Sequence, residues 1–372
     1  MNSADDRKPV PILFVLPNLR AGGAERVSII LLSLLDRSRF APELVVFDGA
    51  GEFKDLLPAG IPVHDLSVGR LRSAFRPLLR VIRARRPALV FSSHSYVNLA
   101  LLAGRGFFPK GTKIVVREPS TPSRSLPDTR FSFLLKLGYW LLFRRADRVI
   151  CLNREAEDDL LSRYGVDPER LVLLPNPVSV AALRDAAETP VRDPGPGRRL
   201  VAAGRLTPAK GFDNLLRVLP STPGDIFLTI YGDGPEEAAL KSLCRALGLD
   251  ARVRFAGFER QLAPALAGAD AVVAPSRWEG FPNVVLETLA CGTQVISTPE
   301  AGGVRELQAE FPAGAVTLAA SQAALIDAIC AVRESGHRKI RPSLLPERFD
   351  ESSVTGLFAA TLDKALGNQS GS

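Results

Sequence analysis

The chain has 372 residues, of which 46% are hydrophobic and 23% are charged, and its formal net charge is +7. This composition is that of a globular protein and excludes a disordered or fibrous chain, while the length favours two domains over a single core. No uncharged apolar run approaches the roughly 20 residues that cross a bilayer, and the acidic N-terminus does not resemble a signal peptide. We therefore expect a soluble or peripheral protein with two domains.

Cysteine and histidine are too scattered for a local metal motif. The chain has four cysteines and three histidines, and they stand at Cys151, Cys244, Cys291, Cys330, His64, His94 and His337. None of them has the CxxC or HxxxH type of spacing that zinc sites use. Cys151 and Cys291 are interpreted as small buried apolar residues, and the pattern is consistent with a reducing cytosol.

Short apolar runs alternate with segments of helical periodicity along the whole chain. The predicted strands are 11–16, 43–47, 61–66, 88–91, 113–116, 148–152, 171–174, 200–203, 226–231, 253–255, 271–274 and 294–297. The main predicted helices between them are 24–35, 72–85, 97–103, 131–143, 155–164, 236–247 and 282–290. Such an alternation predicts parallel sheets with helices on both faces. Residues 121–129, rich in Pro, Ser and Arg, are predicted to be a loop.

A Pro- and Gly-rich stretch between Ala187 and Arg199 marks the domain boundary. We predict an N-terminal domain over 1–180, a linker over 181–198 and a C-terminal domain over 199–345. The last helix, 351–366, is expected to pack back on the first domain. The predicted fold class is α/β, with two doubly wound, Rossmann-like parallel sheets facing each other across a cleft.

The polar loops of interest all follow the carboxyl ends of predicted strands, where open α/β sheets place their ligands. Gly22 and Gly23 open a helix and allow close approach of a ligand. His94 follows the strand 88–91. The dinucleotide fingerprint GxGxxG is absent, which disfavours a dehydrogenase.

Two glycines and two cations follow the strand 200–203. Gly204 and Gly211 flank Arg205 and Lys210. The glycines allow a diphosphate to approach, and the cations neutralise it.

The stretch from Ala274 to Gly292 has two glutamates eight positions apart, Glu279 and Glu287. Pro282 is favoured at the first position of a helix, so Glu279 is expected in the loop and Glu287 about two turns up the helix. We expect the N–H groups of Asn283, Val284 and Val285 to face the loop at the positive end of the helix dipole, where they suit an anion. The alternative is an ordinary loop and helix with two solvated glutamates.

The excess positive charge is concentrated in one predicted helix. Arg72, Arg76, Arg80 and Arg83 recur there at helical spacing, and Arg144, Arg145 and Arg148 follow the apolar helix Phe131 to Phe143. Nucleic acid is disfavoured because neither cluster alternates with the aromatic residues that single-strand binders use. An anionic membrane surface fits better. An ordinary solvated basic face, with the apolar helix in the core, remains the alternative.

These motifs, taken in order, resemble the glycosyltransferases of family 4, which are retaining enzymes with the GT-B fold. The resemblance is carried by Gly22-Gly23-Ala24-Glu25-Arg26, Asn176-Pro177-Val178, Gly204-Arg205 with Lys210-Gly211, Gly232-Asp233-Gly234-Pro235, Glu279 with Glu287 as the family's E-x7-E motif, and Gly302-Gly303. It spans almost the whole chain and is strongest between 199 and 306.

The resemblance implies a role for each matching residue. Arg205 and Lys210 would hold the donor diphosphate and stabilise the leaving charge without a metal or cofactor. Glu279 would contact the donor sugar, and Glu287 the ribose hydroxyls. Catalytic roles are implied for Arg205, Lys210, Glu279 and His94, with His94 lining the sugar pocket. Donor contacts are further implied for Gly22, Gly23, Gly204, Gly257, Phe258, Gly280, Phe281, Asn283 and Glu287, and acceptor contacts for Arg117 and Glu118.

The implied activity is transfer of a sugar, with retention, from a nucleotide-diphosphate sugar to a lipid-linked or cell-surface glycan acceptor at the cytosolic face of a membrane. UDP is the commoner nucleotide of such enzymes. Front-face attack, in which the leaving phosphate acts as base, is the implied chemistry. The alternative is a non-catalytic nucleotide-binding or scaffold protein on the same fold. The sequence does not identify the sugar, the acceptor, the choice between UDP and GDP, or the oligomeric state.

Overall fold

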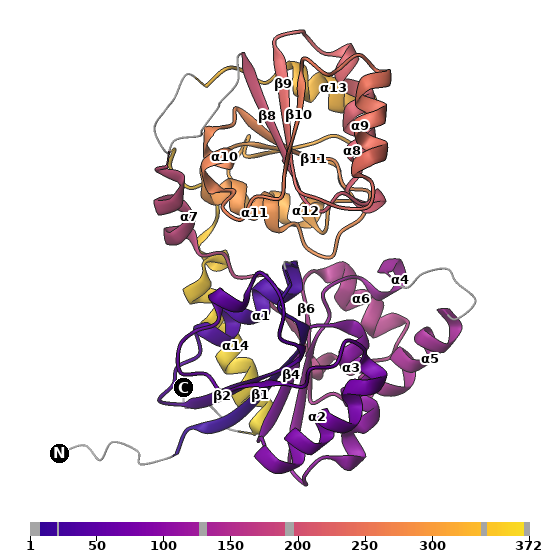
Figure 1. Cartoon of the computed structure of the whole chain (residues 1–372), viewed down its shortest axis with the longest axis vertical. Coiled ribbons are helices and arrows are strands. Elements are labelled where there is room, and N and C mark those ends of the chain that lie inside the picture. Colours follow the sequence, from indigo (N-terminus) through magenta and orange to yellow (C-terminus); the bar gives the residue numbers. More distant parts are fainter. Residues whose placement is uncertain (1–7, 21, 126–131, 190–196, 336–340, 368–372) are drawn as a thin grey trace, which may run out of the picture. The chain divides into compact units, whose positions relative to one another are not determined.

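The computed structural model describes residues 8–20, 22–125, 132–189, 197–335 and 341–367. These residues form two compact units, one comprising the chain up to Pro177 together with Glu351 onward, and the other comprising Val178–Asp350 (Figure 1). Each unit is an α/β domain, which confirms the predicted pair of doubly wound domains.

Unit 1 contains one parallel sheet of seven strands. The strands are β1 (Val10–Asn18), β2 (Phe40–Asp48), β3 (Val63–Asp65), β4 (Leu89–Ser92), β5 (Lys113–Arg117), β6 (Arg148–Cys151) and β7 (Leu171–Leu173). Its helices are α1 (Gly23–Ser33), α2 (Leu71–Arg85), α3 (Ser95–Gly104), α4 (Pro122–Ser125), α5 (Ser132–Leu142), α6 (Arg154–Ser162) and α14 (Glu351–Leu366). The strand order β3-β2-β1-β4-β5-β6-β7 reverses between β1 and β4.

Two apolar layers cover this sheet. On one face, α1 and α14 pack against side chains such as Phe14 and Phe91, and Phe358 of α14 makes edge contacts with both rings. On the other face, α2, α3, α5 and α6 pack against residues such as Val15 and Val116. The last helix thus packs on the sheet that begins the chain.

Unit 2 contains a parallel sheet of six strands in the order β10-β9-β8-β11-β12-β13, which reverses between β8 and β11. The strands are β8 (Arg198–Ala203), β9 (Ile226–Tyr231), β10 (Val253–Gly257), β11 (Ala271–Ala274), β12 (Val295–Ser297) and β13 (Val316–Leu318). The helices are α7 (Val180–Ala187), α8 (Phe212–Val218), α9 (Glu237–Ala246), α10 (Ala263–Gly268), α11 (Asn283–Ala290), α12 (Val304–Leu307) and α13 (Gln322–Cys330).

The expected linker differs from what the structure contains. The chain passes from unit 1 to unit 2 after Pro177, and residues 180–187 form α7, which packs against α10 and α11. The helix forms because Leu183 and Ala187 recur at helical spacing and become buried there. Residues 190–196 of the expected linker lie outside the described residues.

Part of the predicted loop 121–129 is helical, since α4 covers Pro122–Ser125, and residues 126–129 lie outside the described residues. The α4 segment begins at a proline, and the Ser123 N–H donates to Asp159 of α6 at 2.8 Å. That contact with α6 is a tertiary one, and local sequence patterns do not contain it.

Helix α5 is apolar on two sides. Tyr139 is buried in the core, and Phe143, directly after the helix, stacks on its ring. Phe133, Leu134, Leu137, Trp140 and Leu141 are exposed, and Phe133 has 69% of its surface accessible. Phe131, with which the predicted segment began, lies outside the described residues.

Among the described helices, none combines the length and apolarity that a membrane crossing requires.

Candidate active site

Lys210 and Glu279 meet at the point where the strand order of unit 2 reverses. Lys210 lies in the turn after β8, and Glu279 lies in the loop after β11, the strand beside β8. The Lys210 Nζ is 2.7 Å from Glu279 Oε2, with side chains that are 23% and 7% exposed. Ligands of open α/β sheets bind outside the carboxyl ends of the strands at such a reversal. This is therefore the candidate donor site.

Glu279 is also held from two other directions. The Ser276 hydroxyl donates to Glu279 Oε1, and the backbone of Gly302 packs against the glutamate so closely that a Cβ there would lie 3.0 Å from Glu279 Cβ. Gly302 adopts φ +57, a backbone conformation that favours glycine. The glycine of the Gly302-Gly303 motif thus shapes the pocket around the carboxylate.

Arg205 is the exposed cation of the site. It follows Gly204, and a Cβ on that glycine would lie 3.2 Å from Lys210 Cε, so the glycine leaves room for the lysine stem. Among the described residues, the Arg205 side chain makes no ion pair or side-chain hydrogen bond. A guanidinium in this position can donate hydrogen bonds to two phosphate oxygens at once.

The other predicted donor residues of unit 2 follow the carboxyl ends of β10 and β11. Glu287 is half-buried on α11, and Phe281 is buried at the base of the loop. Gly257 ends β10, and Phe258 after it is 50% exposed. These positions are compatible with the donor contacts that the resemblance implies, and those contacts stay predictions.

The expected anion site at the start of α11 is wrong in part. The N–H of Asn283 donates to the Phe281 carbonyl at 3.1 Å, and the N–H of Val285 donates to the Pro282 carbonyl at 3.0 Å. Pro282 is the N-cap of α11, with φ −88 and ψ 71, and the chain turns tightly there. Because this turn satisfies the two N–H groups internally, they are not presented to a ligand, and Arg205 and Lys210 remain the predicted phosphate contacts.

A second pair of oppositely charged side chains lies at the strand reversal of unit 1. His94 follows β4, and its Nε2 lies 3.0 Å from Oε1 of Glu25, near the start of α1. The distance is that of an ion pair, but the angles are not those of a hydrogen bond, so both ring nitrogens lack a hydrogen-bond partner among the described residues. The pair contributes a charge interaction only when His94 is protonated.

Gly22 also has a local packing role, while its expected contact with the donor stays a prediction. A Cβ at this position would lie 2.2 Å from Glu25 Oε2, so the glycine leaves space for a side chain of the protein itself. The Glu25 carboxylate therefore lies between the Gly22 backbone and His94. No local sequence signal indicated Glu25 for this role.

Arg117 and Glu118, expected on the acceptor side, are buried. Glu118 accepts from Ser95 of α3 at 2.7 Å and from Tyr139 of α5 at 2.9 Å, while Arg117 donates to Asn176. Burial raises the pKa of Glu118 to about 7, against the lowering effect of its hydrogen bonds and of Arg117. Burial likewise lowers the pKa of Arg117 to about 10. In this structure Glu118 connects α3 to α5, and neither side chain has surface open to an acceptor.

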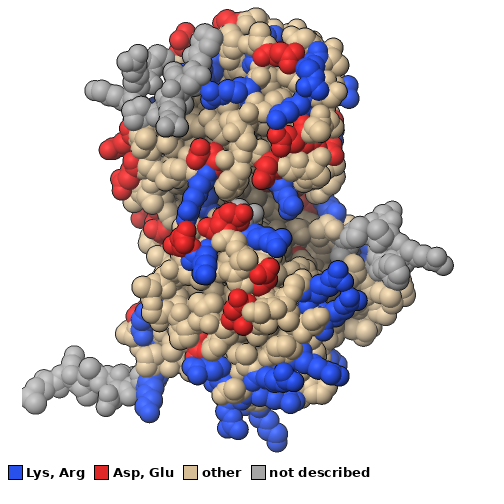
Figure 2. All heavy atoms as spheres, viewed as in Figure 1, with Lys and Arg blue, Asp and Glu red and all other residues tan. Residues whose placement is uncertain are grey.

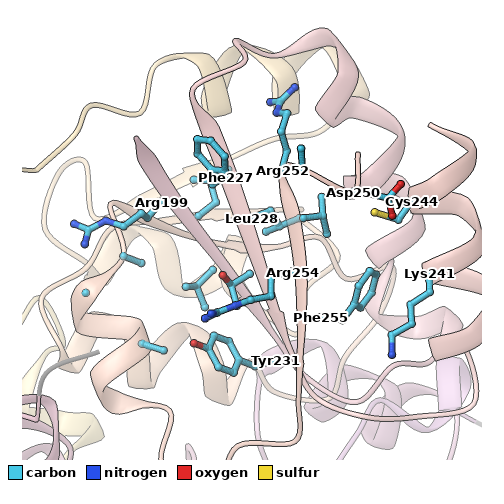
Figure 3. Close-up of a pocket in the computed structure, with 18 of the residues that line it drawn as sticks. Arg199, Phe227, Leu228, Tyr231, Lys241, Cys244, Asp250, Arg252, Arg254 and Phe255 are labelled. Atoms are coloured by element: carbon cyan, nitrogen blue, oxygen red, sulfur yellow. The ribbon is translucent and has the colours of Figure 1, made fainter. Parts of the chain in front are cut away.

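A hollow of about 560 Å³ lies elsewhere in unit 2, over β8, β9 and β10. Figure 3 shows Arg199, Phe227, Tyr231 and Arg254 around it. Arg199 faces Asp270 at 3.6 Å, and Arg252 donates to four groups, including the Ile226 carbonyl. Since Arg205, Lys210, Glu279 and Glu287 do not line it, this hollow is separate from the candidate donor site.

The prediction that the chain has no local zinc motif was based only on the spacing of cysteines and histidines along the sequence. Among the described residues, no group of three or more His, Cys, Asp or Glu side chains could hold a metal ion. Cys151 and Cys291 are buried, as expected. Burial raises the pKa of the Cys291 thiol to about 12.

Two family models match the chain, one in each half. Residues 21–182 match the model "Glycosyltransferase Family 4", and residues 188–342 match "Glycosyl transferases group 1". Together these matches cover most of the chain. The chain therefore belongs to the family 4 glycosyltransferases with the GT-B fold, as its motifs predicted.

Individual relatives agree with this assignment. The chain is 27% identical over 313 residues, 78% of its own length and 81% of the other, to an N-acetylgalactosaminyltransferase of Campylobacter jejuni named for a diphospho-undecaprenol substrate. It is 34% identical over 163 residues to the lipopolysaccharide core glycosyltransferase LpsE of Rhizobium meliloti, covering 43% of this chain and 46% of that protein. The crystal structure of Anabaena HepE with UDP-glucose has the same fold, with a TM-score of 0.78, 20% identity, and coverage of 95% of this chain and 99% of that one.

Proposed function

We propose that this glycosyltransferase moves a sugar from a nucleotide-diphosphate sugar, with UDP as the nucleotide, to a lipid-linked or cell-surface glycan acceptor. The transfer retains the anomeric configuration and needs no metal. It takes place at the cytosolic face of a membrane. The observation that carries the proposal is the Lys210–Glu279 pair at the strand reversal, beside the exposed Arg205.

The donor proposal rests on the electrostatics of this site. An incoming diphosphate competes with Glu279 for Lys210, and the released carboxylate can then accept hydrogen bonds from sugar hydroxyls. Arg205 supplies a second cation with a fork that matches phosphate oxygens. The HepE structure contains UDP-glucose, which supports a uridine nucleotide as the first candidate.

The chemistry follows from the same groups. The acceptor hydroxyl oxygen bonds to the anomeric carbon while the bond from that carbon to the diphosphate oxygen breaks. The hydroxyl proton passes to the leaving phosphate, whose added negative charge Arg205 and Lys210 stabilise. Glu279, held by Lys210 and Ser276, positions the sugar, so no protein carboxylate is required as base.

The acceptor proposal rests on unit 1 and on the relatives' names. The Campylobacter relative is named for a diphospho-undecaprenol substrate. The exposed apolar side chains of α5 flank a hollow of about 360 Å³ that is lined by Phe133, Trp140, Lys136 and Arg163 among others. Apolar surface with adjoining cations suits an amphiphilic anionic lipid.

The basic residues of α2 lie in the same layer as α5. Arg72, Arg76, Arg80 and Arg83 are exposed, while Ala74, Leu78 and Ile82 of α2 are buried. Figure 2 shows Lys and Arg side chains gathered over the part of unit 1 where Figure 1 places α2. We propose that these arginines contact anionic headgroups.

The donor proposal is tested by thermal shift with UDP, GDP, ADP and their sugars. A bound nucleotide raises the melting temperature of the wild type by mass action, and Lys210→Ala should lose most of that shift. Lys241→Ala is the matched control, because Lys241 pairs with Glu237 at 2.6 Å on α9, outside the site. No shift with any nucleotide would overturn the donor proposal, and a shift without turnover on any acceptor would favour a nucleotide-binding scaffold.

The membrane proposal is tested by flotation with vesicles of phosphatidylglycerol and phosphatidylcholine. Replacing Arg72, Arg76, Arg80 and Arg83 by Gln should remove most binding to anionic vesicles, since each cation near such a surface contributes about 1 kcal/mol. Unchanged binding would refute the role of α2.

Retention is tested by determining the anomeric configuration of the product. Metal independence is tested by measuring turnover in the presence of excess chelator.

A further inference from the structure

Arg277 ties the loop that carries Glu279 to the turn that carries Lys210. Its guanidinium donates to both carboxylate oxygens of Asp213 at 2.8 and 2.7 Å. The same group donates to the Pro208 carbonyl at 2.7 Å and to the Asn214 side chain at 3.1 Å. The fork of an arginine thus spans the turn from both sides of Lys210.

The backbones of the two segments also touch. The Arg277 N–H donates to the Ala209 carbonyl at 2.7 Å. Gly211 has φ +64, and a Cβ on it would lie 2.1 Å from the Pro275 carbonyl oxygen. Only glycine allows this approach. Residues 208–211, the first turn of α8 and residues 275–277 are therefore interlocked.

The charges of the pair reinforce the contact. The hydrogen bonds that Arg277 donates to Asp213 lower the pKa of Asp213 and raise the pKa of Arg277. Both side chains are 34% exposed, so the pair by itself stabilises the fold modestly. Its geometry fixes the separation of two loops whose tips carry Lys210 and Glu279.

We propose that Arg277 and Asp213 are positioning residues that set the distance between Lys210 and Glu279 for donor binding. The inference rests on the proposed function, in which these two side chains take the diphosphate and the sugar. Without the paired hydrogen bonds from the Arg277 guanidinium to Asp213, the turn and the loop can separate. Lys210 is then at the wrong distance from the diphosphate. Small misplacements of this kind are costly in sites that depend on orientation.

The chain offers a matched control. Arg198 donates to both oxygens of Asp225 at 2.9 and 2.7 Å and also to the carbonyls of Cys330 and Val332. This second fork has the same chemistry in the same unit, but it joins the starts of β8 and β9 instead of the loops of the site.

The experiment compares Arg277→Gln and Asp213→Asn with Arg198→Gln and Asp225→Asn. We expect the first two variants to bind UDP about tenfold more weakly or worse by calorimetry and to slow hydrolysis of the bound UDP-sugar. Arg277→Lys, which keeps the charge without the fork, should fall between. The Arg198 and Asp225 variants should bind UDP within about twofold of the wild type. Each variant is assayed at a temperature equally far below its own melting temperature.

A double-mutant cycle with Lys210→Ala separates positioning from general stability. If Arg277 acts through Lys210, Arg277→Gln should have little further effect on UDP affinity in the Lys210→Ala background. An equal loss in both backgrounds, or equal losses for the Arg277 and Arg198 variants, would overturn the inference. Failure of the wild type to bind any nucleotide would instead overturn the proposed function.

Discussion

The two strand reversals of this chain carry the same kind of pair with different chemistry. At β1 and β4 of unit 1, His94 faces Glu25, and at β8 and β11 of unit 2, Lys210 faces Glu279. The Lys210 and Glu279 side chains are 23% and 7% exposed, and the His94 and Glu25 side chains are 11% and 14% exposed. The lysine of unit 2 is therefore more accessible than the histidine of unit 1, and it is the one that we propose to meet a diphosphate.

A second difference concerns the neighbours of each pair. Lys210 lies close to exposed Arg205, and the interlocked loops around Arg277 support it. In unit 1, Ser95, the residue after His94, donates to the buried Glu118, which links α3 to α5. The comparison teaches that one topology can place a partly exposed ion pair at the strand reversal in one copy and a buried structural cluster near it in the other.

The largest effect is expected from Glu279→Gln, which tests the separate roles of Lys210 and Glu279 in unit 2. We expect turnover to fall by ~10²–10³-fold, the range for loss of a group that acts on the reacting centre. UDP affinity should stay equal or rise, because Lys210 no longer has a competing carboxylate. Steady-state kinetics and calorimetry with UDP measure the two effects separately. A parallel loss of UDP affinity would contradict the division of roles between Lys210 and Glu279.

The structural character of the cluster in unit 1 is tested by Glu118→Gln. Because the pKa of Glu118 in the folded protein, about 7, lies above its ordinary value of 4.5, the folded protein holds this proton more tightly than the unfolded chain. The free energy of unfolding should therefore fall as pH rises from about 4.5 to 7 and stay low above that range. Relative to the wild type, Glu118→Gln should gain on the order of 3 kcal/mol between pH 4.5 and 8.

The measurement is a series of urea unfolding curves for both proteins across this pH range. Tyr139→Phe removes one of the donors to Glu118, and because that hydrogen bond lowers the pKa of Glu118, this variant should keep the falling pH profile and extend it to higher pH. Parallel pH profiles for the wild type and Glu118→Gln would show that Glu118 is not the titrating group.

The apolar face of α5 is tested by replacing Phe133 and Trp140 with serine. Both side chains are exposed, so folding should hardly change, while vesicle binding should weaken by about tenfold per residue, as expected for a buried aromatic side chain. Exposed Leu357 on α14, replaced by serine, serves as the control. Equal flotation of all three proteins would argue against membrane contact through α5.

The smallest effect is expected from Glu25→Gln. The Glu25–His94 pair is mostly buried, but Gln keeps a polar side chain of the same size, so stability should fall by no more than about 1 kcal/mol, and UDP affinity should stay within about twofold because the proposed donor cations are in unit 2. Thermal melting and calorimetry measure both. A large loss of UDP affinity would contradict the assignment of the donor site to unit 2.

Much of this protein follows from local patterns in the sequence. The alternation of apolar runs and helical periodicity predicts both parallel sheets, because each strand and helix is encoded within its own segment. Arg205, Lys210 and Glu279 were identified because glycines and charges after a strand are themselves a local signal. The family 4 assignment also follows from those motifs.

Only the tertiary structure decided which side chains meet. The contact of Lys210 with Glu279, and that of Arg277 with Asp213, depends on β8 and β11 lying side by side, an order that neither segment contains. Burial of Glu118 depends on Ser95 and Tyr139 arriving from α3 and α5. The N–H groups of Asn283 and Val285 were expected to face a ligand, and a tight turn at Pro282 uses them instead. Local patterns thus determined the elements, and the order of strands in the sheets determined the chemistry between them.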